Sequence, residues 1–176
     1  MRFPLSARGI AAAILCVVCI SGSARAEAPT LMGSFKSWYV YSVGADATRV
    51  CYALSSPTAT LPKGARRDPI YVIISTWPGR NVHNEPSFVP GYPYKDGSTV
   101  QIRVGNDIFT AFTKTTGTAG GAWIQQGSDE VHLIEAMRHG ISMVVTGTSR
   151  RGTKTTDTYS LAGIADALEA IAKACR

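Results

Sequence analysis

The sequence predicts a mostly β protein, an antiparallel β-sandwich or barrel-like domain with two short helices, one of them C-terminal. Three observations support this fold class: apolar and polar residues alternate from residue 34 onward, glycine and proline recur between the alternating segments (17 Gly and 9 Pro), and two stretches have helical periodicity. A content of 45% hydrophobic and 17% charged residues is typical of a globular chain. It excludes a disordered protein, and 176 residues exclude a multi-domain enzyme.

Eight short strands are expected. Residues 70–74 form a continuous apolar run, as in a central strand buried on both faces. The turn at 105–107 predicts a hairpin, and a strand after the loop at 149–152 should return antiparallel to the one before it. The expected strands are 35–41, 48–54, 70–74, 99–104, 108–114, 121–125, 141–148 and 153–159.

Two helices complete the expected fold. Ser128 is the expected N-cap of a helix over 129–139, which has acidic residues in its first turn and ends before Gly140. A second helix is expected over 161–174, because apolar residues recur there at steps of three and four. That apolar stripe consists of Leu161, Ile164, Leu168, Ile171 and Cys175.

Residues 1–26 have the pattern of a cleaved secretory signal peptide. Arg2 and Arg8 precede an uncharged run over 10–20, and small residues end the segment, so cleavage is expected between Ala26 and Glu27. A helix of eleven residues rises about 16 Å, too short for a bilayer core of about 30 Å. We therefore expect one exported β-rich domain over 27–176, soluble and without a transmembrane anchor.

Removal of the signal peptide changes the charge. Three of the 18 basic residues lie within 1–26 and none of the 12 acidic residues does, so 15 basic and 12 acidic residues remain, a net charge of +3. This charge is too small to indicate nucleic-acid binding.

Cysteine usage predicts a disulfide. Cys16 and Cys19 lie in the signal peptide, which leaves Cys51 and Cys175. Two thiols in an oxidising compartment are expected to pair, closing a loop of 123 intervening residues. Two buried free thiols or a reactive cysteine are the alternatives.

Two segments contain candidate binding residues. The sequence around Arg150 and Arg151 resembles a phosphate-binding loop, but the strand-like run after it favours a hairpin loop whose arginines can contact an anionic partner. The second segment, 77–94, mixes aromatic residues, prolines and charges, and reads as a long irregular loop. Its candidates are Arg80, His83, Tyr92 and Tyr94; the alternative is that Trp77, Phe88 and Tyr92 close one end of the sandwich.

No reaction is indicated by the sequence. His83, His132 and His139 lack the spacing of a zinc site, and no nucleophile motif is present. We expect no metal and no cofactor, and nominate no catalytic residue.

Several stretches together resemble one protein family. They are Ser34 to Trp38, Val50 to Ala53, Val89 to Pro93, Ala136 to Gly140, Gly147 to Gly163 and Ala167 to Ile171. In these the chain is similar to the invasion-associated locus B family of exported proteins from Gram-negative bacteria. The resemblance implies a mostly β periplasmic protein with no established catalytic residues. Some members have another cysteine soon after the tryptophan; residues 39–50 have none here, which limits this chain to one bridge.

The sequence and the resemblance together favour a non-enzymatic periplasmic protein. Association of this periplasmic protein with the outer membrane is a second option for its location. Its partner would be an unknown envelope or host-surface component, and the protein would contribute to host-cell interaction. The alternatives are an envelope hydrolase acting on cell-wall or glycan substrates, and a carbohydrate- or peptide-binding module.

Overall fold

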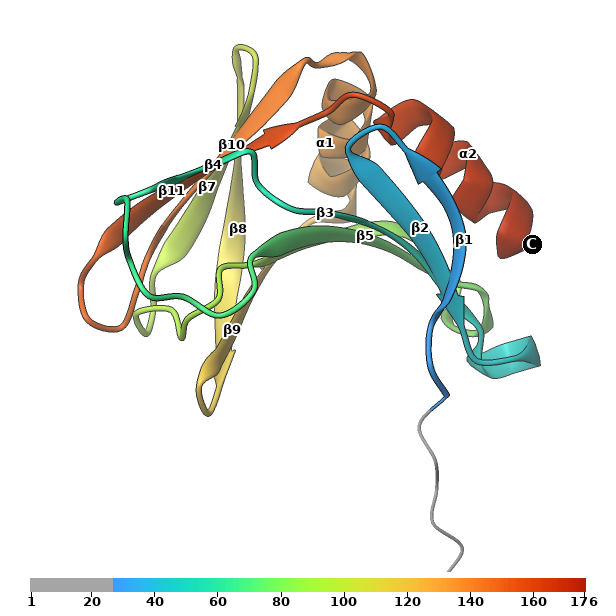
Figure 1. The fold of residues 1–176 in the computed structure, drawn as a ribbon, viewed down its shortest axis with the longest axis horizontal. Coiled ribbons are helices and arrows are strands. Elements are labelled where there is room, and N and C mark those ends of the chain that lie inside the picture. Colours follow the sequence, from blue (N-terminus) through green and yellow to red (C-terminus); the bar gives the residue numbers. More distant parts are fainter. Residues whose placement is uncertain (1–26) are drawn as a thin grey trace, which may run out of the picture.

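The computed structural model describes residues 27–176, which form an antiparallel sheet of eleven strands and two α-helices (Figure 1). The expected signal peptide and Ala26 lie outside the described residues. The strand order across the sheet is β1-β2-β3-β5-β6-β9-β8-β7-β10-β11-β4. The strands are β1 (Thr30–Phe35), β2 (Trp38–Val43), β3 (Val50–Ser55), β4 (Ala59–Leu61), β5 (Tyr71–Trp77), β6 (Val82–Val89), β7 (Thr99–Val104), β8 (Asp107–Thr116), β9 (Ala119–Ile124), β10 (Ser142–Thr148) and β11 (Lys154–Ser160).

The sheet is open and strongly bent. Its edges are β1 and β4, and the two halves join where β6 pairs with β9 at only two positions, Ser87 with Trp123 and Phe88 with Ala122. Strands β7, β10 and β11 consequently lie at a steep angle to β2, β3 and β5 (Figure 1). The predicted fold class is confirmed: the chain is mostly antiparallel β structure in a sandwich-like arrangement, with two helices.

One face of the sheet is covered by both helices and carries the core. Alternate residues of each strand point to this face, as the two-residue period of a strand requires. In the central strand β5, Val72 and Ile74 are buried, whereas Tyr71 and Ile73 are only half-buried. The prediction that this strand is buried on both faces was therefore wrong, because neither α1 (Gly127–His139) nor α2 (Ile164–Ala174) covers its second face.

The helices are α1 (Gly127–His139) and α2 (Ile164–Ala174). No helix within residues 27–176 has the length and apolarity needed to cross a membrane. The predicted stripe of α2 is confirmed, since all five of its residues are buried. Ser128 is not the N-cap of α1: the helix begins one residue before it, Gln126 is the N-cap, and no side chain caps the end. The second helix begins at 164 rather than 161, because Gly163 has a positive φ of 92°.

Two strand predictions near the N-terminal end of the described chain were too long. Residues 35–41 are not one strand: Phe35 ends β1, residues 36–37 form a turn in which Lys36 has a φ of 54°, and β2 begins at Trp38, which pairs with Phe35. Because the alternation of apolar residues continues across this tight turn, the sequence pattern does not reveal the turn. The predicted start of the next strand at Thr48 was also wrong, because residues 46–48 form a 3-10 turn.

The segment 77–94, expected to be an irregular loop, contains the eight-residue strand β6. A 3-10 turn over 78–80 and Asn81, with a φ of 54°, return the chain so that β6 pairs with β5. Proline disfavours a central strand, but Pro86 pairs only with Ile74 of β5 and lies outside the short β9 pairing. The three-residue edge strand β4, which pairs with β11, was also missed.

The predicted Cys51–Cys175 disulfide is present. It joins β3 to the residue that ends α2, with the two Cα atoms 5.9 Å apart and both residues buried. The stripe of α2 turns Cys175 toward the sheet, and Cys51 lies on the covered face of β3. The bridge therefore fastens the last helix to the sheet across a sequence separation of 124 residues.

Reduction of this bridge should destabilise the protein. Closing so long a loop lowers the entropy of the unfolded chain, a contribution of about 4–5 kcal/mol in the chain-entropy model. We expect urea unfolding with reductant to show a lower free energy of unfolding, and alkylation to label both cysteines only after reduction. The variant Cys51→Ala/Cys175→Ala is the control, because reductant should not change its midpoint. An unchanged midpoint for the unmodified protein would contradict this role.

Candidate functional site

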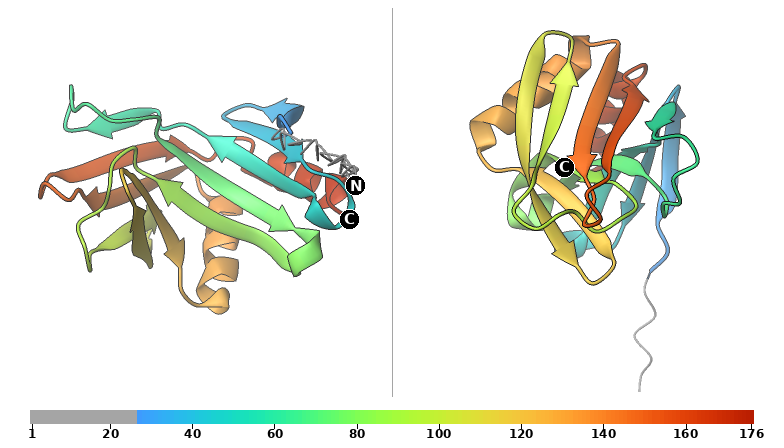
Figure 2. Two further views of the ribbon diagram at one scale, coloured as in Figure 1. Left: turned by 90° about the horizontal axis from the view of Figure 1, so that it is seen from below. Right: turned by 90° about the vertical axis from the view of Figure 1, so that its left-hand side faces the viewer.

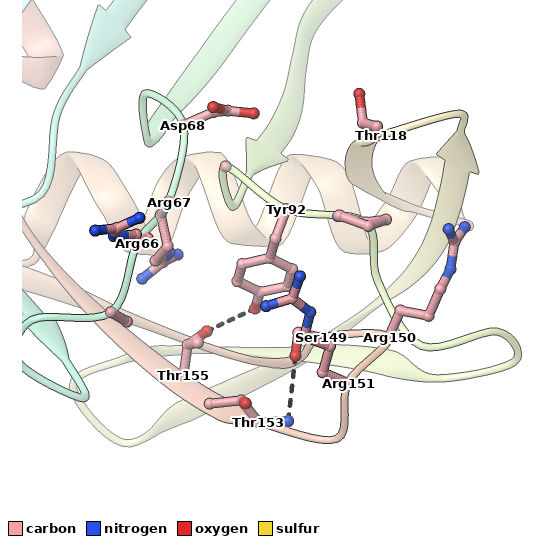
Figure 3. A pocket seen from close by; sticks show the side chains of 13 residues that line it. Arg66, Arg67, Asp68, Tyr92, Thr118, Ser149, Arg150, Arg151, Thr153 and Thr155 are labelled. Atoms are coloured by element: carbon pink, nitrogen blue, oxygen red, sulfur yellow. Dashed lines mark hydrogen bonds between the residues drawn. The ribbon is translucent and has the colours of Figure 1, made fainter.

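Four connections between strands meet at one end of the sheet. They are the loop 62–70 after β4, the loop 90–98 after β6, the turn 117–118 after β8 and the loop 149–153 after β10. Backbone hydrogen bonds join three of them: Asp68 donates to Gly91 O (2.9 Å), and Arg150 donates to Pro93 O (2.9 Å). Together the four connections surround an open cleft of about 830 Å³ (Figure 3).

The base of this cleft is a buried ion pair between Arg67 and Asp157. The guanidinium donates two parallel hydrogen bonds to the carboxylate, at 2.7 and 2.6 Å, and its Nε donates to Pro90 O at 2.8 Å. The two side chains are only 5% and 4% exposed. Burial alone would lower the pKa of Arg67, but the hydrogen bonds and negative charge of Asp157 outweigh this and raise it. The pair thus fixes loop 62–70 onto β11.

Tyr92 extends this arrangement into the cleft. The Arg67 guanidinium lies 5.0 Å from the centre of the Tyr92 ring, and the Tyr92 hydroxyl hydrogen-bonds with Thr155 Oγ1 at 2.6 Å. Tyr94 packs edge-on against Tyr92, with ring centres 5.4 Å apart, and is buried. Burial raises the pKa of both phenols. The hydrogen bond to Thr155 and the edge-on packing against Tyr94 hold the Tyr92 ring in place.

Gly91 allows two of these loops to touch. It has a φ of 72°, and a Cβ at this position would overlap the carbonyl oxygen of Asp68. Only glycine accommodates both the left-handed backbone and the close approach. The contact between loops 62–70 and 90–98 therefore depends on this residue.

The rim of the cleft is polar and mainly basic. Arg66 lies on one side of Tyr92 and Arg150 on the other, and the Arg151 side chain lies between them in this view (Figure 3). Asp68 is the acidic lining residue. Hydroxyl groups complete the lining, from Thr118, Ser149, Thr153 and Thr155. This arrangement can hold a polar, negatively charged ligand by hydrogen bonds and ion pairs.

The structure separates the residues named as a candidate binding surface. Tyr92, Arg150 and Arg151 line the cleft, and Tyr94 is buried beneath it. Arg80 and His83 lie at the opposite end of β5 and β6, where Arg80 stacks on Trp77 with 4.8 Å between the guanidinium carbon and the ring centre. The segment 77–94 is thus not one surface, because strand β6 divides it. The alternative, in which Trp77, Phe88 and Tyr92 together close one end of the sandwich, was also wrong. Phe88 is a core residue, and Trp77 lies at the other end of the sheet from Tyr92.

The central pair of the site was missed in the sequence. Arg67 and Asp157 are 90 residues apart, so no local pattern relates them. One signal was present: in the alternating strand 153–159, Asp157 occupies an inward position between Thr155 and Tyr159. A charged residue at an inward position requires a partner.

The loop 149–153 is confirmed as a hairpin loop. Strands β10 and β11 pair over seven positions on either side of it, and the element directly after the loop is a strand, not a helix. Within residues 27–176, no group of three or more His, Cys, Asp or Glu side chains is arranged to hold a metal ion.

The fold and cleft define a disulfide-bonded antiparallel β protein whose loops hold a basic, polar cleft. The family model for invasion associated locus B (IalB) protein matches residues 40–172, so the chain belongs to this family. A crystal structure of invasion associated protein B from Bartonella henselae has a similar fold, with a TM-score of 0.59 at 12% identity over 82% of this chain and 98% of that one. No curated protein matches the chain.

Breaking the buried ion pair should be costly. The variant Arg67→Met leaves the Asp157 carboxylate buried without a counterion, and such changes lower the free energy of unfolding by about 3–5 kcal/mol. The double variant Arg67→Met/Asp157→Leu should recover much of this loss, because it removes both charges. Urea unfolding followed by tryptophan fluorescence measures each value.

Lys173→Ala is the matched control for the ion pair. It breaks the exposed Glu169–Lys173 pair (3.6 Å) on α2 and should change the free energy of unfolding by less than about 0.5 kcal/mol. A loss for Arg67→Met no greater than that for Lys173→Ala would show that the buried pair does not hold the loop.

Gly91→Ala should disturb the cleft more than an equivalent change elsewhere. The matched control is Gly97→Ala in the same connection, because Gly97 has a similar φ of 69° but open space around it. Left-handed strain alone costs about 1–2 kcal/mol, so Gly97→Ala should lower stability by that amount and Gly91→Ala by clearly more. Thermal unfolding of both variants tests this, and equal losses would contradict the close contact.

Proposed function

We propose that this protein is exported to the periplasm and acts there without catalysis, binding a component of the envelope or of a host surface in the cleft between its loops. The observation that carries the proposal is the preformed cleft itself. A bidentate ion pair, a cation–π contact and a tyrosine hydrogen bond hold its base, so a ligand would meet an ordered surface and lose little entropy in ordering it.

Export is supported by two independent features. The N-terminal segment has the pattern of a signal peptide, and the Cys51–Cys175 bridge is of a kind that persists in oxidising compartments. Membership of a family named for invasion supports a contribution to host-cell interaction.

A binding role is favoured over hydrolysis by the residues of the cleft. Hydrolases need a titratable pair positioned at the reacting bond. Among the described residues that line the cleft there is no histidine or cysteine, and Asp68 is the acidic one. The Asp157 carboxylate beneath them is occupied by Arg67 through two hydrogen bonds. These side chains suit ligand binding better than proton transfer.

Photo-crosslinking in living cells tests this function. A benzoylphenylalanine at position 118 would place the reactive group on the cleft, since Thr118 is an exposed lining residue. We expect it to yield one recurrent adduct with an envelope component.

Position 141 provides the matched control. Ile141 is 90% exposed and lies at the far end of β10 from the cleft, so the same probe there should not give that adduct. Identical adducts from both positions, or none from 118, would contradict the proposal. The intact mass of the periplasmic protein should begin at Glu27; a full-length mass would contradict export.

A further inference from the structure

Positive charge is concentrated at the loop end of the molecule. The four connections and the adjoining residue 154 contain six basic residues outside the buried pair, Lys63, Arg66, Lys95, Arg150, Arg151 and Lys154, against two acidic residues, Asp68 and Asp96. Their net charge of +4 exceeds the +3 of residues 27–176 as a whole. None of these eight side chains forms an ion pair within those residues.

The topology produces this concentration from distant parts of the chain. The β10–β11 hairpin and the chain that leaves β4 project at the same end, and the C-terminus lies at the other (Figure 2). Strand β4 pairs with β11 so that Leu61 lies opposite Thr156, which brings Lys63 toward Lys154. Like charges gathered without counterions repel one another, so their shared location is a cost that an anionic ligand would relieve.

In loop 149–153 the arginine side chains, and not the backbone amides, are available to contact a ligand. The Arg150 backbone amide donates to Pro93 O, and the Gly152 amide donates to Ser149 O at 2.8 Å. These amides are therefore already used, unlike those of a phosphate-binding loop that precedes a helix. An anionic ligand would therefore be bound by the guanidinium groups, whose planar arrangement of N–H donors matches the oxygens of a phosphate or carboxylate.

Ser149 adds an oriented hydroxyl to this loop. Its Oγ accepts a hydrogen bond from the Thr153 backbone amide at 3.1 Å, which leaves its own hydrogen available to donate. Thr118 and Thr153 contribute further hydroxyls to the lining. The cleft thus offers several donors to one anion.

Charge and size distinguish among anions. The lining residues Arg66, Arg150 and Arg151 against Asp68 give a local charge of +2, and Arg67 is neutralised by Asp157. A phosphate monoester carries about −1.5 to −2 at neutral pH, a closer match than a single carboxylate at −1. The cleft volume of about 830 Å³ lies in the range of small-molecule sites and exceeds what one phosphate fills. The ligand therefore carries a larger polar body.

We propose that the cleft binds a phosphate group on a larger polar ligand, such as a sugar phosphate or a lipid headgroup, and that Arg150 and Arg151 contact this phosphate. The inference rests on the proposed binding function and names the chemistry of its ligand.

Calorimetric titration with glucose 6-phosphate, and with glucose as the uncharged comparison, tests recognition of a soluble phosphate. Cosedimentation with phosphatidylcholine vesicles, with and without phosphatidic acid, whose headgroup is a phosphate monoester, tests recognition of a lipid headgroup. We expect binding to a phosphate-bearing probe that weakens as salt is added. Binding of glucose 6-phosphate assigns the soluble source, and binding of phosphatidic acid vesicles alone assigns the headgroup.

The variant Arg150→Gln/Arg151→Gln should weaken that binding by about tenfold or more, because the loss of even one charge-assisted hydrogen bond has an effect of that size. Its matched control is Arg80→Gln/Arg103→Gln, which removes the same charge from exposed positions away from the cleft and should leave affinity within about twofold. Near-ultraviolet circular dichroism confirms that both variants fold.

Three outcomes would overturn the inference: no binding to either phosphate probe, equal binding of glucose and glucose 6-phosphate, or equal losses in the two double variants. A crosslink at position 118 that survives in Arg150→Gln/Arg151→Gln, together with any of these, would leave the binding function standing and remove only the phosphate assignment. Absence of the crosslink in the unmodified protein would remove the binding function itself.

Discussion

A charged side chain placed on the covered face of the sheet determines how the loop end of this molecule is built. Asp157 lies on β11 among inward-pointing residues, where an ionised carboxylate without a partner would be strongly unfavourable. Arg67 satisfies it from a loop 90 residues away in sequence. Because that loop must then lie across β11, Pro90 accepts from the same guanidinium and Tyr92 packs beneath it. This neutralisation holds one wall of the cleft, together with the backbone hydrogen bonds from Asp68 to Gly91 and from Arg150 to Pro93.

The two ends of the protein are stabilised by different means. At the end that carries the C-terminus, a disulfide fastens α2 to β3, and an apolar stripe buries the helix. At the loop end, ion-pair and tyrosine contacts hold segments without regular structure. Hydrophobic burial is tolerant of direction, whereas bidentate hydrogen bonds require defined geometry. Polar contacts are therefore suited to positioning the residues of a binding cleft.

Local patterns predicted the local elements well. The hairpin of β7 and β8, the hairpin of β10 and β11, and the stripe of α2 were all visible because the residues that form each one are neighbours in sequence. Strand β6 was missed since Pro86 and the mixed composition around it suggested a loop, and pairing with β5 outweighed those signals. The turn at Lys36 was missed because the alternating pattern runs through it.

The sequence by itself determined the fold class, the pattern of an export signal and the pairing of the two remaining cysteines. These depend on periodicity, on the composition of one short segment and on there being two thiols to pair. Only the tertiary structure decided which residues share a site. It placed Arg80 and His83 away from Tyr92, and it brought Arg150 and Arg151 to the cleft. The physical reason is that the sheet order joins strands distant in the chain, so loop neighbours are set by hydrogen-bonded pairing and by one buried charge rather than by sequence proximity.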